Sequence, residues 1–251
     1  MTERPVVLVT GAARRIGRAI ALELGTQGWD VALHHRQSAP DAESLRAELV
    51  AAGARVQVFA ADLADEAQCR ALLPAVRAAF GRVDAVVNNA SLFEYDSVAD
   101  FGYASMERHW RANTGPAVLL ARALHEAGGG AVVNLLDQKL WNPNPDYFSY
   151  TLSKAALEAA TRLLAQALAP SVRVCAVAPG ITLPSDLMSE AEFAASARMT
   201  PLGRPSTALD IARSVRFLLE SPSVTGSTLL VDAGQHLLPQ RRDVVFLARE
   251  P

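Results

Sequence analysis

The stretch VVLVTGAARRIG, residues 6–17, decides the fold predicted for this chain. Its first four residues form a short, branched apolar run typical of a buried parallel strand. Gly11 and Gly17 then permit a tight turn in which backbone N–H groups approach a phosphate. From Ile16 onward, apolar residues repeat at the spacing of a helix that packs on a sheet. A glycine-rich turn between strand and helix is the context that a dinucleotide-binding site requires.

The same alternation of apolar runs and helical patterns continues along the chain. We predict strands at residues 5–10, 30–35, 55–60, 83–88, 130–136, 172–178 and 228–232. We predict helices at residues 15–27, 41–52, 66–80, 104–127, 148–169 and 207–220. Strand–helix alternation gives a parallel sheet covered by helices on both faces. The expected fold is α/β, a Rossmann-type doubly wound three-layer sandwich with a seven-stranded parallel sheet.

The length of 251 residues suits one domain of this kind, and we predict a single dinucleotide-binding domain over residues 1–251. Residues 182–205, which include Leu183-Pro184-Ser185-Asp186 and a short Ala/Glu-rich helix, interrupt the alternation. They are interpreted as a substrate loop, with a surface insertion as the alternative. The tail at residues 239–251 contains an apolar patch after a charged turn. It could cover a neighbouring subunit or dock on its own surface.

Ligands of open parallel sheets bind at the carboxyl ends of the strands. The residue types that follow the predicted second strand decide which dinucleotide fits there. An NAD site has an acidic residue at this position, and an NADP site has a cation for the extra phosphate. The sequence has no Asp or Glu there; it has His35, Arg36 and Ser38. NADP(H) is therefore favoured, although Arg36 could also be a solvated loop arginine.

Tyr150 and Lys154 lie four residues apart in a predicted helix, so both side chains leave the same face. A phenol has a reference pKa near about 10, too high for efficient proton transfer at neutral pH. An ammonium one turn away favours the phenolate, and we expect Lys154 to lower the pKa of Tyr150. Asp137 follows an apolar run and could lie at the strand end facing this helix. Its alternative interpretation is a turn or cap residue.

With these residues the chain resembles the short-chain dehydrogenase/reductases, from about residue 5 to about residue 238. Further segments match that family's pattern in order and spacing: Asp62-Leu63, Asn88-Asn89-Ala90, Asn113, Pro179-Gly180 and Val231-Asp232-Ala233-Gly234. The resemblance implies a catalytic set of Asp137, Tyr150, Lys154 and Asn113, with Asn113 holding a water of the proton relay. It also implies contacts to the cofactor from Gly11, Arg14, Arg15, Ile16, Gly17, His35, Arg36, Ser38, Asp62, Leu63, Asn89, Ala90, Ser91, Tyr150, Lys154, Pro179, Gly180 and Ile181.

Two departures narrow the resemblance, since most members carry glycine in place of Arg15 and serine in place of Asp137. Together with Ser91 and Phe93, these residues are similar to the pteridine reductases and dihydromonapterin reductases. That subgroup implies that Arg15 reaches toward pyrophosphate and pterin, and that Phe93 stacks the pterin ring against the nicotinamide. It implies that Asp137 assists Tyr150 in donating a proton. The implied substrate-binding residues are Arg15, Ser91, Phe93, Asp137, Tyr150 and Leu183. For Phe93, simple packing is an equal alternative.

The expected function is NADPH-dependent hydride transfer to a C=N bond of a pterin such as dihydromonapterin or dihydrobiopterin, with dihydrofolate as a further candidate. A carboxylate can accept the N–H donors of such a heterocycle, whereas a ketone oxygen is better served by a hydroxyl donor. A carbonyl reductase for an aldehyde or ketone, with Asp137 a bystander, is the first alternative. A catalytically idle NADP-binding protein is the second. The intact set of Asn113, Tyr150 and Lys154 argues against it.

Composition excludes several other classes. The formal net charge of −2 predicts no general attraction to nucleic acid or anionic membrane. No apolar run approaches the ~20 residues of a membrane span, and no signal peptide is expected because the first strand begins near Met1. Cys69 and Cys175 are isolated, which fits a cytoplasmic protein better than a disulfide framework. No Cys/His spacing resembles a metal site. The family suggests a homo-oligomer, either a tetramer or a dimer.

Overall fold

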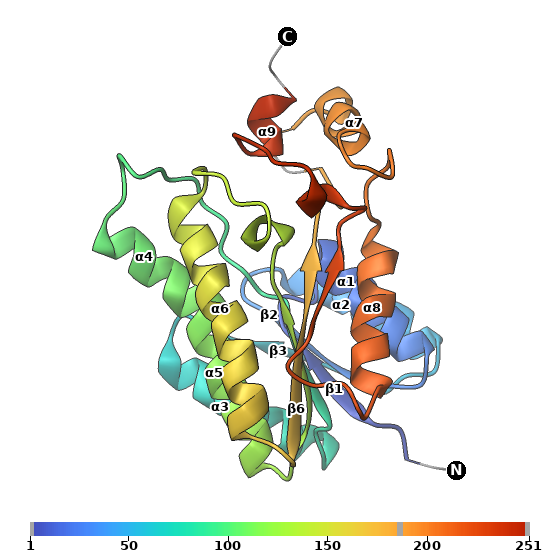
Figure 1. Ribbon diagram of the computed structural model, residues 1–251. Helices are drawn as coiled ribbons and strands as arrows, with labels where there is room; N and C mark the ends of the chain where they lie inside the picture. Colours follow the sequence, from blue (N-terminus) through green and yellow to red (C-terminus); the bar gives the residue numbers. More distant parts are fainter. Residues whose placement is uncertain (1–2, 185–187, 249–251) are drawn as a thin grey trace.

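The computed structural model describes residues 3–184 and 188–248 (Figure 1). Part of the predicted substrate loop, Ser185 to residue 187, and the end of the predicted tail, residues 249–251, lie outside the described residues. The described strands are β1 (Val6–Val9), β2 (Asp30–His35), β3 (Val56–Ala60), β4 (Ala85–Asn88), β5 (Gly130–Leu135), β6 (Val172–Pro179) and β7 (Thr228–Val231). They form one parallel sheet in the order β3-β2-β1-β4-β5-β6-β7, which confirms the predicted fold class.

The winding of the sheet reverses at β1, which pairs with β2 on one side and β4 on the other. Val7 is in register with Val31 of β2 and with Ala85 of β4. All four residues of β1 are buried, because helices cover both faces of this central strand. A crevice opens at the carboxyl ends of the strands where such a reversal occurs, and ligands of doubly wound sheets bind there.

Helices cover the sheet on both faces (Figure 1). One face carries α1 (Arg15–Thr26), α2 (Ala39–Ala51) and α8 (Ala208–Glu220), and the other carries α3 (Glu66–Phe80), α5 (Gly115–Glu126) and α6 (Phe148–Ala167). The side chains of β1 alternate between two buried clusters, as the period of a strand requires. Val7 and Val9 pack with α1 and α8, whereas Val6 and Leu8 pack with α3 and α5.

The single helix predicted over residues 104–127 is wrong in one respect. The structure has α4 (Tyr103–His109), a π-helical turn η1 (Trp110–Thr114) and then α5. Pro116 has no backbone N–H to continue the α-helical pattern, and the N–H of Gly115 instead bonds five residues back to the carbonyl of Trp110. The predicted boundaries of the other helices hold to within a few residues.

Two short helices lie above the carboxyl ends of the strands, α7 (Glu190–Arg198) within the predicted substrate loop and α9 (Val244–Leu247) in the tail (Figure 1). Two 3-10 turns lie in the same region, η2 (Gln138–Leu140) and η3 (Gln235–Leu237). Val245 is only 4% exposed. The described part of the tail therefore docks on its own chain, the second of the two predicted arrangements. Among the described helices, none is long and apolar enough to cross a membrane.

Candidate active site

Two adjoining cavities open at the carboxyl ends of the strands, one of about 430 Å³ and one of about 360 Å³. We call the first the dinucleotide cavity, because the glycine turn lines it, and the second the substrate cavity. Four residues line both and mark where the cavities meet: Arg15, Ile16, Asn89 and Ser91.

The glycine turn leaves no room for a side chain at Gly17. Gly11 has a φ of +61°, and a Cβ on Gly17 would lie 2.1 Å from the carbonyl oxygen of Gly11. The Asn89 side chain donates to the carbonyls of Thr10 and Gly11, at 3.0 and 3.1 Å. Any larger residue at position 17 would therefore push the turn away from the sheet. The N-terminal end of α1, beside this turn, is suited to the phosphates of a dinucleotide.

His34, which sequence reasoning missed, holds the turn from β2. Its Nδ1 accepts the N–H of Gly11 at 3.1 Å, and its Nε2 lies 3.0 Å from the carbonyl oxygen of Ala61. Only a neutral ring can accept at one nitrogen and donate at the other. Burial lowers the pKa of His34 to about 4, which keeps the ring neutral near pH 7. The signal was present in the alternation of the strand, which turns neighbouring His34 and His35 to opposite faces.

Most of the predicted cofactor contacts line the dinucleotide cavity: Gly11, Arg14, Arg15, Ile16, Gly17, Arg36, Asp62, Leu63, Asn89, Ala90 and Ser91. Pro179, Gly180, Ile181, Tyr150 and Lys154 line the substrate cavity beside it. The predictions for His35 and Ser38 are not met, since neither lines a described cavity. Successive residues of a strand face opposite sides, and on β2 it is His34 that lines the dinucleotide cavity; Ser38 is the N-cap residue of α2.

The charges of the dinucleotide cavity fit an anionic ligand. Arg36 and Arg15 are exposed at its surface, and Arg15 has a φ of +53°. Arg14 also lines the cavity, but its guanidinium forms an ion pair with Asp41 of α2 at 2.6 Å. Because the cavity combines a bare glycine turn with unshielded arginines, the residues present fit a dinucleotide that carries an additional phosphate.

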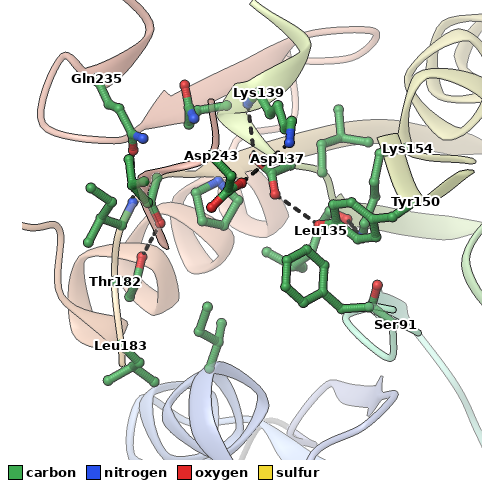
Figure 2. A pocket seen from close by; sticks show the side chains of 18 of the residues that line it. Ser91, Leu135, Asp137, Lys139, Tyr150, Lys154, Thr182, Leu183, Gln235 and Asp243 are labelled. Atoms are coloured by element: carbon green, nitrogen blue, oxygen red, sulfur yellow. Dashed lines mark hydrogen bonds and ion pairs between the residues drawn. The ribbon is translucent and has the colours of Figure 1, made fainter. Parts of the chain in front are cut away.

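Asp137 and Tyr150 meet in the substrate cavity (Figure 2). The hydroxyl of Tyr150 donates to Oδ2 of Asp137 at 2.9 Å, and the N–H of Lys139 donates to Oδ1 at 2.9 Å. Asp137 is therefore both the cap of η2 and the partner of the tyrosine, so the two interpretations of this residue hold together. The two side chains come from the end of β5 and from the first turn of α6.

The predicted direction of the Tyr150 pKa shift is wrong for this structure. Burial, followed by the charge of Asp137 and its hydrogen bond, raises the pKa of Tyr150 well above its usual value. Lys154 does not offset this effect, since its ammonium donates to the carbonyl of Leu135 at 2.7 Å and lies 5.7 Å from the ring centre of Tyr150. Burial lowers the pKa of Lys154 to about 8 and raises that of Asp137.

Asn113 lies just outside the cavity linings. Its side-chain amide donates to the carbonyl of Leu92 and to the hydroxyl of Ser153, and its oxygen accepts from Ser91 and from the Leu92 N–H. These contacts fasten the segment after β4 to the π turn and to α6. The side chain is thus engaged in protein hydrogen bonds and is not brought into the described cavities.

Phe93 faces the substrate cavity with one ring face already covered. It stacks on Tyr147, with ring centres 4.2 Å apart and an angle of 15° between the planes, and meets Tyr150 edge-on at 4.7 Å. The side chain remains 47% exposed. Packing and ring stacking, the two alternatives for Phe93, are therefore compatible, because the stacked pair presents a flat aromatic surface to the cavity.

Sequence reasoning missed part of the substrate cavity. Leu183 lines it as predicted. Met188 and Phe193 line it from within the predicted substrate loop, although they are not among the residues named from the sequence. The missed residues come from two other regions: Gln138 and Lys139 beside Asp137, and Gln235, Asp243, Val244 and Val245 in the C-terminal region. No local motif links these segments. Within the described residues, no group of three or more His, Cys, Asp or Glu could hold a metal ion.

Comparison with known proteins identifies the family. A family model described as enoyl-(acyl carrier protein) reductase matches residues 11–236 of the chain. The chain belongs to the short-chain dehydrogenase/reductase family. It is 35% identical to a protein of Streptomyces violaceoruber described as a ketoacyl reductase of the granaticin polyketide synthase, over 94% of this chain and 98% of that protein.

Two solved structures are also similar to the chain. The FolM alternative dihydrofolate reductase 1 of Brucella suis, in complex with NADP, is 40% identical, with a TM-score of 0.91 over 97% of this chain and 99% of that chain. The enzyme of the same name from Brucella canis, also with NADP, is 40% identical, with a TM-score of 0.90 over 95% of this chain and 96% of that one. The chain is thus an oxidoreductase of the family.

Proposed function

We propose that this member of the family is an NADPH-dependent reductase that transfers a hydride to a C=N bond of a pterin, either a dihydropterin or dihydrofolate. The observation that carries the proposal is the hydrogen bond of 2.9 Å between Tyr150 and Asp137 inside the substrate cavity. The family resemblance implies that most members carry a serine hydroxyl at the position of Asp137. A carboxyl group there suits a heterocycle with N–H donors better than it suits a ketone oxygen.

The cofactor is NADP(H), which when bound supplies a hydride from its reduced nicotinamide. Arg36 and Arg15 at the dinucleotide cavity provide the positive charge for its phosphates. The raised pKa of Tyr150 keeps the phenol protonated at neutral pH, which leaves it a proton to donate but makes it a weaker acid than a free phenol. Tyr150 would deliver that proton to the ring nitrogen, with Asp137 as its hydrogen-bonded partner. Lys154 would hold the nicotinamide ribose beside them.

The two similar solved structures support the pterin assignment. Both are named as alternative dihydrofolate reductases, and each is 40% identical to this chain. The stacked pair of Phe93 and Tyr147 offers the flat surface that a pterin ring needs. A second function, reduction of a ketone or aldehyde, is favoured by a different observation. The sequence relatives include the 3-oxoacyl-[acyl-carrier-protein] reductase FabG of Staphylococcus aureus, 31% identical over 92% of this chain and 97% of that protein.

The test is NADPH oxidation with a panel of dihydropterins, dihydrofolate, oxoacyl thioesters and simple ketones. We expect turnover with at least one pterin, and Tyr150→Phe to lower kcat about 10²- to 10⁴-fold with nearly unchanged NADPH affinity. Tyr103→Phe, on a side chain that is 89% exposed, is the matched control and should leave turnover unchanged. Activity on ketones with none on any pterin would replace this proposal by the second function.

We further propose that the chain forms a homo-oligomer, a dimer or a tetramer, as family resemblance suggests. Leu152 and Leu163 lie three turns apart on one side of α6, 40% and 65% exposed, and exposed apolar surface of this kind is typical of an interface. We also propose that residues 1–251 act as a single domain in the cytoplasm. The buried, unpaired thiols of Cys69 and Cys175 support a reducing compartment.

A further inference from the structure

The C-terminal segment Gln240–Leu247, here called the tail segment, is fastened beside the substrate cavity. The guanidinium of Arg242 forms a two-pronged ion pair with Asp146, with N–O distances of 2.9 Å at both prongs. The same guanidinium lies 4.6 Å from the ring centre of Phe246, and that ring meets Tyr95 edge-on at 5.5 Å. These contacts hold the segment on both sides of Asp243. The tail segment is therefore packed against the rest of the protein by specific contacts.

Between these anchors, the tail segment forms one wall of the substrate cavity. Asp243, Val244 and Val245 line that cavity together with Asp137 and Tyr150. The N–H of Asp243 donates to Asp146 at 2.8 Å, which fixes the backbone at the point where the side chain enters the cavity. Leu135 of β5 and Pro179 of β6 line the cavity from the sheet, whereas this wall comes from residues that lie after the last strand.

Lys139 connects the tail segment to the reacting pair (Figure 2). Its backbone N–H donates to Asp137, and its ammonium donates to the carbonyl of Asp146 at 2.6 Å and lies 3.3 Å from Oδ2 of Asp243. Lys139 is only 3% exposed, so little water screens the charge of its ammonium. One residue therefore touches both carboxyl groups of the cavity, Asp137 through its backbone and Asp243 through its side chain.

The charges of Lys139 and Asp243 shift the pKa of Asp137 in opposite directions. Burial is the main reason that the pKa of Asp137 is raised, the charge of Lys139 lowers it, and the charge of Asp243 raises it. Asp243 also adds to the rise of the Tyr150 pKa, after burial and Asp137 itself. Among the described residues, the ionisable groups that face this pair come from four parts of the chain: Lys139 after β5, Lys154 on α6, Asp243 in the tail segment and Arg15 at the start of α1.

We propose that the tail segment is a working wall of the substrate cavity and that Asp243, acting with Lys139, is a positioning residue that sets the charge balance around the Asp137–Tyr150 pair. The inference rests on the acid role proposed for that pair. The competing view is that Asp243 only caps α9, since its Oδ1 accepts the N–H of Val245 at 3.2 Å. The two views differ in what they predict for pH dependence.

The decisive experiment compares Asp243→Asn, Lys139→Met and the double variant in kcat against pH. The hydrogen-bonded pair of Asp137 and Tyr150 must hold the proton that is transferred, so activity falls where rising pH removes that proton from the pair. Loss of the Asp243 charge makes that proton easier to remove and moves the fall to lower pH; loss of the Lys139 charge moves it to higher pH. We expect each shift to be on the order of one unit, and the double variant to lie near the wild type.

Arg241→Gln is the matched control, because Arg241 is an exposed charged residue of the same tail segment. It should leave the pH profile unchanged. If Asp243→Asn and Lys139→Met lower activity without moving the profile, or move it in the same direction, the residues act only on the fold and the positioning role is overturned. Asp243→Glu should restore the wild-type profile, because it keeps the charge.

A second readout needs no substrate and so separates this inference from the pterin proposal. The titration of the Asp137 carboxyl can be followed by its carbon-13 chemical shift, assigned by comparison with Asp137→Asn. The midpoint should fall in Asp243→Asn and rise in Lys139→Met, whatever the enzyme reduces. Equal midpoints in all three proteins would overturn the inference even if a pterin proves to be the substrate.

The role of the tail segment as a wall of the substrate cavity is tested with a shortened chain that ends at Pro239. We expect KM for the active substrate, pterin or ketone, to rise at least about tenfold while the Kd for NADPH stays within about twofold, because the tail segment does not line the dinucleotide cavity. Phe246→Ala, which loosens only one anchor, should give a smaller rise in KM. An unchanged KM in the shortened chain would show that the tail segment is not a wall of the cavity.

Discussion

At the scale of single residues, burial decides the chemistry of the candidate site. Tyr150 and Lys154 have the spacing that would acidify a phenol, yet the pKa of Tyr150 is raised, because its hydroxyl is buried against Asp137 and the ammonium of Lys154 is directed at a carbonyl. The raised pKa keeps the proton on the phenol, which is the form that the proposed acid role requires. The spacing in the sequence located the residues, and the burial set the direction of the shift.

The buried ammonium of Lys154 leads to a prediction about stability. Its pKa is about 8 in the folded protein and near 10.5 when unfolded, so the unfolded chain binds more protons between these values. Stability contributed at this position therefore rises as pH increases through about 8. We expect the wild type to gain about 1 kcal/mol over Lys154→Met between pH 7 and pH 9. Urea unfolding of both proteins measures the difference, and parallel pH curves would contradict the assignment.

Arg36 leads to a prediction about cofactor choice. Its exposed guanidinium lines the dinucleotide cavity at the end of β2, where an additional phosphate would be bound. We expect Arg36→Leu to weaken NADPH binding about 10- to 100-fold, as the loss of a charged hydrogen bond would, and to leave NADH binding nearly unchanged. Arg46→Leu, on the outer side of α2, is the control for a general loss of positive charge. A similar loss of affinity for NADPH and NADH would show that Arg36 does not bind the additional phosphate of NADPH.

At the scale of elements, the site depends on how strands and helices end. The π turn between α4 and α5 places Asn113 where it fastens the segment after β4. The glycine turn is held by Asn89, which follows β4, and by His34 of β2. These contacts join elements that are distant in the sequence. The interruption of the helix predicted over residues 104–127 thus coincides with the turn that carries Asn113.

His34 leads to a prediction at this scale. Its pKa is lowered by burial from 6.5 to about 4, so the unfolded chain binds more protons between these values, and stability is lost as pH falls below about 6.5. We expect the stability of the wild type relative to His34→Gln to decrease by about 2 kcal/mol between pH 8 and pH 5. Chemical denaturation at the two pH values measures it. A difference that stays constant would mean that His34 is not held neutral.

At the scale of the whole molecule, the candidate site is assembled from the two ends of the chain. The glycine turn after β1 lines one cavity, and the tail segment closes the adjoining one, with the ends of β4, β5 and β6 between them. Most of the chain is needed to complete it. The outer surface of the molecule also carries exposed apolar residues on α6, and these residues support the proposed homo-oligomer.

The oligomer is tested by sedimentation equilibrium. We expect the mass of a dimer or tetramer for the wild type and a lower mass for Leu163→Glu, because a buried unpaired carboxylate would oppose association at that face of α6. Circular dichroism would confirm that the variant is folded. A monomeric mass for the wild type at micromolar concentration would contradict the proposal.

The sequence by itself determined the architecture and where most of the chemistry lies. Continuous apolar runs, helical spacing and a glycine turn are local signals, so the seven-stranded sheet, the position of the dinucleotide cavity and the candidate residues Asp137, Tyr150 and Lys154 could be predicted. The tertiary structure alone decided the neighbourhood of those residues: the role of His34, the direction of the Tyr150 pKa shift, and the wall formed by Asp243 opposite Lys139. Burial and electrostatic contact depend on which distant segments meet, and no spacing within one segment records that.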